Sequence, residues 1–468
     1  DATTLDPNMH SETPTANVVI NIFDSLVQRN REMQIEPWLA REWRVIDENT
    51  WEFVLQEGVK FHNGDPLTAE DVKFTIERIL DPANESPQIS DLSAIERVDV
   101  LDDLTFRIIT KQPFPTLLAE LTEKQIVPKD YIEANGAEYF ATNPVGTGPY
   151  KFVSWTKDDR IVLEANEEYW KGAPAIKTVE FRVIPENQTR IAALQTGEVD
   201  IIVNVPPDQA QVLEQAEGTR VSKAPSARVI FIGISDLSGE GPLSDPRVRQ
   251  ALNYAVNKQA IIDSILLGNG IQVPGPLTSR HFGYDPDLKP YPYDPARARE
   301  LLAEAGYADG FTVNFDSPNG RYLQDKEIAQ AIAGQLEEVG LDVQLNVLEW
   351  GVYVDKIFAR KLDGLWLLGW GNSTFDADGT LYPMFHSKAI FSYYRNPEYD
   401  ALIDEARAVL DQERRAELYR EALAILHADA PWIFLHQQLD IYGVSERVNW
   451  EARSDEDIWL YEASLKTE

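Results

Sequence analysis

The residues best suited to chemistry lie together between Leu367 and Pro383, in a stretch that reads LLGWGNSTFDADGTLYP. The stretch begins as an apolar run typical of a strand, sets one tryptophan between two glycines and then becomes polar. Its candidate site residues are Trp370, Asn372, Ser373, Asp376 and Asp378. An aromatic ring beside hydrogen-bonding groups suits a small polar solute with apolar parts, whereas two carboxylates suit acid–base catalysis.

The two aspartates of this stretch, Asp376 and Asp378, stand only two residues apart. In glycosidases the paired carboxylates usually come from separate elements and lie about 5 to 10 Å apart. Two aspartates within one loop more often cap a helix or line a polar opening. We therefore expect Asp376 and Asp378 to cap a helix or to contact a ligand, and a carboxylate-dependent hydrolase is kept as an alternative.

Motifs for other kinds of catalysis are absent from the sequence. There is no cysteine, and the six histidines never fall three or four residues apart, so neither thiolate chemistry nor a metal site is predicted. No GxSxG or HExxH segment occurs, although a Ser/His/Asp triad assembled by the fold stays open. The VGTGPY segment lacks the rest of a phosphate loop and is interpreted as a structural turn. We expect a protein without a cofactor that is not an enzyme.

The composition is that of a globular protein with a strongly acidic charge. Of 468 residues, 43% are hydrophobic, and 43 Lys and Arg stand against 77 Asp and Glu, for a formal net charge of -34. Such a field repels nucleic acids, so no nucleic-acid partner is predicted. The length favours two or more domains, and the lack of cysteine suits an oxidising compartment.

The sequence predicts neither a membrane span nor a signal peptide. The apolar runs, such as LWLL at 365–368, are much shorter than the roughly 18 to 20 residues that a membrane span requires. The first residues, DATTLDPNMH, contain neither a basic segment nor an apolar one, so they do not predict a signal peptide. Because the chain starts at Asp1, we interpret it as a mature form from which a leader has been removed.

Capping residues predict where several helices begin. Thr68 followed by Asp71 predicts a helix that ends before Pro82. Asp245 and the proline after it predict one long helix that Gly268 stops. Strand-like segments such as TWEFVL and RVIFIGI lie between the helices. We expect an α/β or α+β protein with more than one sheet.

Several stretches, taken together and in order, resemble the extracytoplasmic solute-binding proteins of peptide, opine and nickel ABC importers, known as solute-binding family 5. They are EWRVIDENTWEFVLQEGVKFHNGDPLTAEDVKFTIERILDP (42–82), NPVGTGPYKFVSW (143–155), LQTGEVDI (194–201), DPRVRQALNYAVNKQAII (245–262) and YDPARARELLAEAGY (293–307). The opening LDPN and the closing PWIFLHQQ are also similar. The resemblance covers essentially the whole chain.

The resemblance implies an α/β, bilobed, periplasmic-binding-protein-like fold of the large type, with an extra subdomain in lobe one. Closure of the two lobes over a solute would expel water and strengthen polar contacts. The implied boundaries are 1–225 plus 439–468 for lobe one, about 27–142 for its extra subdomain, 230–438 for lobe two, and about 223–232 and 436–442 for the hinges.

The resemblance also bears on the ligand. In the family's peptide binders the segment after the strand reads like GWxADY, and its Asp takes the peptide's free amino group. Here Ser373 stands at that position, and a neutral hydroxyl binds an ammonium group less strongly than a carboxylate does. The ligand is therefore expected to be a modified peptide, an opine or a related amino-acid conjugate. An ordinary di- or oligopeptide or an oligosaccharide is the alternative.

Further ligand contacts are expected from both lobes. Trp350 lies near the opening stretch, and Arg228, at the hinge, can bind a ligand carboxylate bidentately. The matching loop of lobe one offers His10, Ser11 and Glu12. We expect a periplasmic or otherwise extracytoplasmic monomer that delivers its solute to an ABC permease in the inner membrane. Presentation of the closed form to a chemosensor is the alternative.

Overall fold

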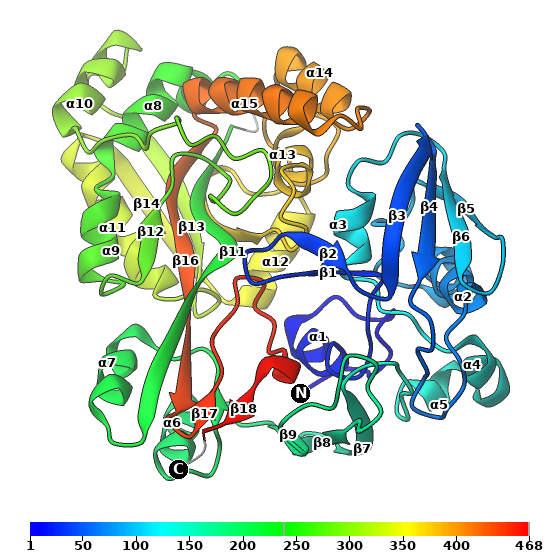
Figure 1. The fold of residues 1–468 in the computed structure, drawn as a ribbon. Coiled ribbons are helices and arrows are strands. Elements are labelled where there is room, and N and C mark those ends of the chain that lie inside the picture. The colour runs from blue at the N-terminus through cyan, green and yellow to red at the C-terminus, as the bar shows by residue number, and fades with distance from the viewer. Residues whose placement is uncertain (237–238, 467–468) are drawn as a thin grey trace. The chain divides into compact units, whose positions relative to one another are not determined.

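The computed structural model describes residues 1–236 and 239–466 (Figure 1). The chain divides into two compact units, which are described separately. Unit 1 comprises Asp1–Ala224 and Asp440–Glu468, and unit 2 comprises Pro225–Leu439. Unit 2 is thus one continuous segment, whereas unit 1 is built from both ends of the chain.

Two long strands carry the chain between the units. The chain enters unit 2 within β11 (Thr219–Ser235) and leaves it within β16 (Trp432–Ser445), and these strands are neighbours in one sheet. Both junctions fall inside the ranges 223–232 and 436–442 that the family resemblance implies for the hinges. Hinge motion itself stays a prediction.

Unit 1 contains a four-stranded antiparallel sheet in the order β3-β4-β6-β5 and a three-stranded antiparallel sheet in the order β7-β8-β9. The four-stranded sheet lies within the range 27–142 predicted for the extra subdomain. The strands of unit 1 are β1 (Val27–Arg29), β2 (Ile35–Pro37), β3 (Ala40–Asp47), β4 (Thr50–Leu55), β5 (Ile95–Val100), β6 (Thr105–Thr110), β7 (Tyr150–Thr156), β8 (Arg160–Ala165), β9 (Thr178–Arg182), β10 (Ile201–Ile202), β17 (Val448–Asn449) and β18 (Ser464–Leu465). Its helices are α1 (Thr13–Val19), α2 (Ala69–Leu80), α3 (Leu117–Leu121), α4 (Lys129–Asn135), α5 (Ala137–Phe140), α6 (Asn187–Gln195) and α7 (Pro207–Gln215).

The helix expected after Thr68 is confirmed as α2. The Asp71 carboxylate accepts hydrogen bonds from the Thr68 backbone N–H and hydroxyl, both at 2.9 Å. The VGTGPY segment is a tightly packed turn, because a Cβ on Gly146 would lie 2.1 Å from the carbonyl oxygen of Ile22. The side chain of His62 also binds this turn, with Nε2 at 3.0 Å from the carbonyl of Gly148. A structural interpretation of the turn fits this packing.

Unit 2 is built on a sheet in which β13 pairs in parallel with both β14 and β15, while β15 pairs antiparallel with β11. Helices accompany these strands in the ribbon view (Figure 1). The further strands of unit 2 are β12 (Gly270–Gln272), β13 (Thr312–Pro318), β14 (Asp342–Leu348) and β15 (Gly364–Gly371). Its helices are α8 (Pro246–Ala255), α9 (Lys258–Ser264), α10 (Pro295–Glu304), α11 (Asp325–Glu338), α12 (Trp350–Phe358), α13 (Asp378–Phe385), α14 (Pro397–Ala406) and α15 (Gln412–Asp429). Sheets combined with many helices confirm the predicted α/β class.

The prediction of one long helix from Asp245 to Gly268 is wrong, because α8 and α9 are separate helices. Val256, between them, has the extended angles φ -94° and ψ 118°. The Asn257 side chain then caps α9 by accepting from the backbone N–H of Ala260 at 3.0 Å. The buried ammonium group of Lys258 donates to the carbonyl of Asn253 in the last turn of α8. Polar side chains therefore satisfy both helix ends at the break.

Candidate ligand-binding site

The parallel strands of unit 2 bring three loops to one edge of the sheet. Because β14 and β15 both run parallel to β13, their carboxyl ends meet at a common edge. Ligands of open α/β sheets bind at the carboxyl ends of the strands. The residues at this edge are the loop 319–324 after β13, Glu349 and Trp350 after β14, and the loop 372–377 after β15. The loop 372–377 belongs to the polar stretch between Leu367 and Pro383.

The two glycines beside Trp370 leave room for larger side chains. A Cβ on Gly369 would lie 2.7 Å from the ring of Tyr322, and a Cβ on Gly371 would lie 3.1 Å from the guanidinium of Arg228. Arg228 is directly opposite Gly371 in the pairing of β11 with β15. Since side chains alternate along a strand, Tyr322 and Arg228 cover the same side of β15. The sequence GWG thus makes space for two neighbours from other strands and loops.

Tyr322 lies beside Gly369, Trp350 and Arg321 at this edge. Its hydroxyl donates to the carbonyl of Gly369 at 3.2 Å, and its ring centroid lies 6.2 Å from that of Trp350. The guanidinium carbon of Arg321 lies 5.0 Å from the Tyr322 ring centroid and 5.2 Å from the Trp350 ring centroid. Burial raises the pKa of Tyr322, and the positive charges of Arg321 and Arg228 oppose that shift. Both guanidinium groups therefore act on the same ring.

Arg321 and Tyr322 were missed in the sequence analysis. Arg321 is exposed, and across residues 1–236 and 239–466 it has cation–π contacts but no carboxylate partner within ion-pairing distance. Its position in the sequence could have indicated its role, because PNGRYLQD follows a strand and precedes a helix. Loops at such positions in parallel sheets bind ligands. A guanidinium held against aromatic rings is suited to bind a carboxylate.

Trp370 lies on the other side of β15. By strand alternation its side chain points away from the side covered by Tyr322 and Arg228. The indole Nε1 donates to the carbonyl of Gly379 at 2.9 Å, and its ring centroid lies 5.8 Å from that of Phe391. Trp370 is half-buried and fixed by its own unit. Arg228 and Trp350 therefore both lie near Tyr322, whereas Trp370 is on the opposite side of β15.

The side chains of Asn372 and Asp376 both bind other groups of unit 2. The amide of Asn372 donates to the backbone carbonyl of Asp376 at 2.7 Å and to the hydroxyl of Thr380 at 3.0 Å. The carboxylate of Asp376 accepts two hydrogen bonds from the guanidinium of Arg415, at 2.9 and 3.0 Å. Both residues are buried. Their polar groups hold the loop in shape.

Asp378 is also paired, whereas Ser373 is open to solvent. The carboxylate of Asp378, at the first residue of α13, lies 3.1 Å from Nε of Arg407. Burial raises the pKa of Asp378 to about 6, against the opposing effect of Arg407. Each of the two carboxylates once considered for catalysis thus has its own arginine. Ser373, at the position of the family's amine anchor, is exposed.

The candidate residues of unit 1 form a separate group around the start of α1. His10 is 8% exposed, and burial lowers its pKa. Burial raises the pKa of Glu12, but hydrogen bonds from Thr15 and Thr3 outweigh that effect and the net shift is downward. Ser11 is exposed, and its backbone N–H donates to Glu12 at 3.1 Å. Ligand binding by His10, Ser11 and Glu12 stays a prediction.

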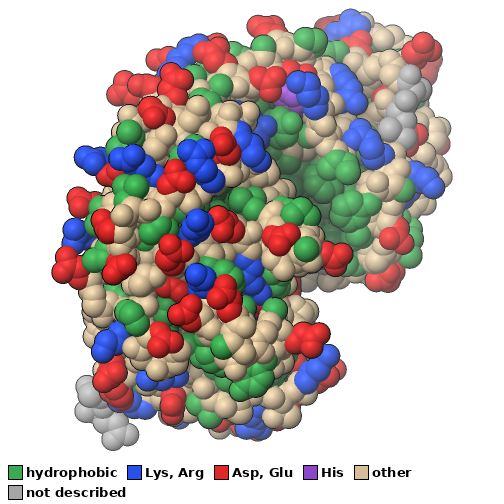
Figure 2. All heavy atoms as spheres, turned by 90° about the vertical axis from the view of Figure 1, so that its right-hand side faces the viewer, with side chains coloured by type: hydrophobic (Ala, Val, Ile, Leu, Met, Phe, Trp, Pro, Cys, Tyr) green, Lys and Arg blue, Asp and Glu red, His purple; other side chains and the backbone are tan. Residues whose placement is uncertain are grey.

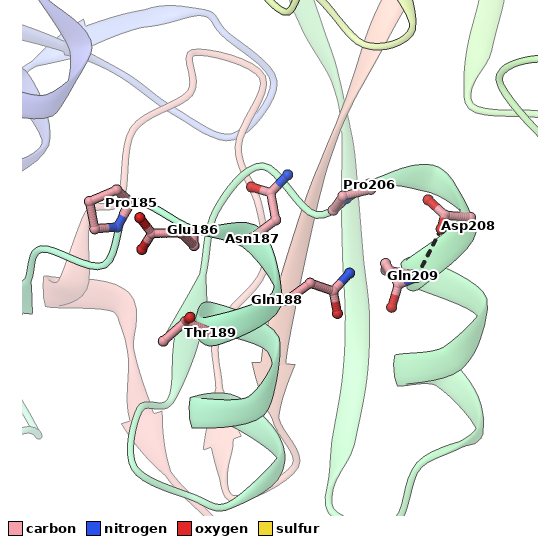
Figure 3. Close-up of a pocket in the computed structure, with 8 residues that line it drawn as sticks. All are labelled: Pro185, Glu186, Asn187, Gln188, Thr189, Pro206, Asp208 and Gln209. Atoms are coloured by element: carbon pink, nitrogen blue, oxygen red, sulfur yellow. Dashed lines mark hydrogen bonds between the residues drawn. The ribbon is translucent and has the colours of Figure 1, made fainter.

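A shallow cavity of about 720 Å³ lies elsewhere in unit 1, between the starts of α6 and α7 (Figure 3). Its lining residues are Pro185, Glu186, Asn187, Gln188, Thr189, Pro206, Asp208 and Gln209. Their side chains are amides, carboxylates, prolines and one hydroxyl, with no aromatic ring and no cation to fix a solute. In the part of the chain that the structure describes, no cluster of His, Cys, Asp and Glu could hold a metal ion. Over the same residues, no helix is both long enough and apolar enough to cross a membrane.

Comparisons with known proteins place the chain in a family. The family model described as "Bacterial extracellular solute-binding proteins, family 5 Middle" matches residues 34–392. The glutathione-binding protein GsiB of Pectobacterium atrosepticum is 33% identical over 447 residues, which cover 92% of this chain and 86% of the relative.

Solved structures agree with that match. The periplasmic binding protein DppA from Helicobacter pylori, in complex with the peptide STSA, is 29% identical with a TM-score of 0.80 and covers 100% of this chain and 96% of its own. The binding protein AgaA from A.tumefacien R10, in complex with agropinic acid, is 27% identical with a TM-score of 0.80 and covers 100% and 97%. The fold is that of a periplasmic binding protein, and the chain belongs to the bacterial extracellular solute-binding proteins of family 5.

Proposed function

We propose that this substrate-binding protein of an ABC importer captures a small peptide-like solute through a free carboxylate, with glutathione and opines as the leading candidates. The observation that carries the proposal is the guanidinium of Arg321, which lies on the rings of Tyr322 and Trp350 and has no carboxylate partner among residues 1–236 and 239–466. The guanidinium of Arg228 acts on the same ring. Arginine binds a carboxylate with two parallel hydrogen bonds.

The polar loop after β15 supports a carboxylate rather than an amine as the main anchor. Ser373 is neutral, and the nearby carboxylates of Asp376 and Asp378 already pair with Arg415 and Arg407. An ammonium group would therefore find no unpaired carboxylate in this loop, whereas an anionic group would find Arg321.

The relatives support the same class of ligand. One is named a glutathione-binding protein, and one was solved with agropinic acid. Glutathione is a tripeptide with two carboxylates, and opines are amino-acid conjugates that also carry them. We also propose that the protein is a monomer outside the cytoplasm and that it delivers its solute to a permease in the inner membrane.

Isothermal titration of the purified protein with glutathione, octopine and an unmodified dipeptide, each with its carboxylate ester, tests the proposal. We expect the acids to bind stoichiometrically without product formation, and the esters to bind much more weakly. In Arg321→Gln, loss of hydrogen bonds to a charged group, about 1.5 to 3 kcal/mol, should weaken the best acid by roughly 10- to 100-fold.

Arg420→Gln is the matched control, because Arg420 is an exposed arginine of α15 and belongs to none of the three loops at the edge. Equal affinity for acid and ester, or an equal loss in the Arg420 variant, would contradict the proposal. Turnover of a bound solute would instead favour a hydrolase.

A further inference from the structure

A single buried carboxylate holds the loop that carries Arg321. Asp325, the first residue of α11, is 2% exposed. Its carboxylate oxygens accept hydrogen bonds from the backbone N–H groups of Gly320 at 2.9 Å, Arg321 at 2.8 Å, Tyr322 at 3.0 Å and Lys326 at 2.9 Å. The loop after β13 is thus gathered around one side chain.

These bonds also stabilise a loop conformation that is otherwise unfavourable. Gln324 has φ 55°, in the left-handed region, and Gly320 has φ 80°. A non-glycine residue adopts the left-handed conformation only where the surrounding structure imposes it. The hydrogen bonds to Asp325 are charge-assisted, and four of them converge on one group. The conformation of the loop therefore depends on this carboxylate.

The consequence concerns the charge of Arg321. The hydrogen bonds of Asp325 go to backbone N–H groups, so the residue fixes the backbone of Arg321 without pairing with its guanidinium. The guanidinium then lies against Tyr322 and Trp350, where its charge is available to a ligand. A charged side chain that is positioned in advance binds an anion with a smaller loss of conformational entropy.

We infer that Asp325 is a positioning residue for ligand selectivity: through the loop 319–324 it holds Arg321 where it discriminates an acid from its neutral ester. The inference rests on the proposed function, because it assumes that Arg321 receives the ligand's carboxylate. It adds that the selectivity depends on a residue that does not touch the ligand.

A double-mutant cycle with glutathione and glutathione diethyl ester as probes tests this role. We expect Asp325→Asn to weaken the binding of glutathione about tenfold and that of the ester much less. The dissociation constant of the ester divided by that of glutathione therefore falls. In an Arg321→Gln background, Asp325→Asn should change the affinity for glutathione little further. A residue that only stabilises the fold would lower the melting temperature and leave the ratio unchanged.

Asp309→Asn is the matched control, since Asp309 is an exposed aspartate of unit 2 outside the loop. If Asp325→Asn does not fold, Asp325→Ser, which keeps one accepting oxygen, provides the same comparison. Additive effects in the cycle, or an unchanged ratio in a folded variant, overturn the role of Asp325 and leave the proposed function standing. Wild-type protein that binds glutathione and its ester equally overturns both proposals, and if neither binds, the cycle is measured with octopine and its ester.

Discussion

At the scale of single residues, Gly369 determines how closely Tyr322 lies against β15. A Cβ at Gly369 would be 2.7 Å from both the Tyr322 ring and the Ile230 side chain, two groups that are buried. Gly369→Ala should therefore destabilise the protein by about 1 to 3 kcal/mol through overpacking and should also displace Tyr322. Urea unfolding monitored by fluorescence measures the loss of stability, and the titrations described above measure the loss of affinity.

Gly371→Ala is the control at the equivalent position two residues on. Its Cβ would meet the guanidinium of Arg228 at 3.1 Å, the end of a flexible side chain that can move. Its stability should change by less than about 1 kcal/mol. Equal destabilisation in both alanine variants would show that the Tyr322 contact is not the cause.

The sequence predicts a polar loop that contains Ser373, but it does not predict which partner each polar side chain of that loop binds. The strand before it and the glycines beside Trp370 are local features, so the loop was found. Asp376 and Asp378 bind arginines that are distant in sequence, Arg415 and Arg407, and such pairings have no local signal. Trp370 was expected beside the other aromatic residue, Trp350, but which way each ring points depends on neighbouring strands and helices.

At the scale of elements, the ion pair of Asp376 with Arg415 joins the loop after β15 to α15. The Arg415 side chain is 1% exposed and that of Asp376 is 9% exposed. Arg415→Met would leave the Asp376 carboxylate buried without its partner, so the free energy of unfolding should fall by about 3 to 5 kcal/mol. Equilibrium unfolding in urea measures this change.

The adjacent residue provides the comparison for Arg415. Arg414 pairs with Glu405 at 2.8 Å, but its side chain is 42% exposed. Exposed ion pairs contribute about 0 to 1 kcal/mol, so Arg414→Met should be nearly neutral. A similar loss in both variants would mean that the buried pair is no more important than the surface pair.

The helix break between α8 and α9 illustrates a different limit of sequence reasoning. Apolar residues recur with helical spacing through the break, so periodicity predicts one helix. Asn257 is a good N-cap residue and was the available signal. The role of Lys258 could not be predicted, because its use depends on burial of the ammonium group beside the carbonyl of Asn253. Burial lowers the pKa of Lys258 to about 7.

At the scale of the whole molecule, buried histidines make stability depend on pH. Burial lowers the pKa of His436 on β16 to about 4, from a usual value of 6.5. Between these values the unfolded chain binds a proton that the folded protein does not, so the free energy of unfolding falls as pH drops from 6.5 to 4. The contribution of this one group is about 3 kcal/mol. In His436→Gln the loss of stability on acidification should be smaller, as unfolding at pH 7.5 and 4.5 would measure.

Asp378 acts in the opposite direction and serves as the internal comparison. Because its pKa is raised from 3.8 to about 6, the folded protein binds the extra proton, and its contribution makes the protein less stable as pH rises through that window. Asp378→Asn should therefore steepen the loss of stability on acidification, whereas His436→Gln reduces it. The same slope in both variants would contradict these assignments.

The family was accessible from sequence because its motifs are spread along the chain, while the lobe boundaries that the resemblance implies stay a prediction. Asp, Glu, Lys and Arg side chains are interspersed over the face shown in Figure 2. Which charged residues pair, and which, like Arg321, contact aromatic rings without an ion pair among the described residues, depends on the folded arrangement of each unit.

The route of the chain through the two units has a consequence for biosynthesis. Unit 2 is complete once Leu439 has been synthesised, whereas unit 1 still lacks Asp440–Glu468 at that point. Val444 of β16 pairs with Ile201 of β10, so a strand of unit 1 waits for a partner from the C-terminal segment. Domains generally fold as units while the chain emerges. The inserted unit can therefore finish folding first, and loss of the segment 440–468 would damage unit 1 rather than unit 2.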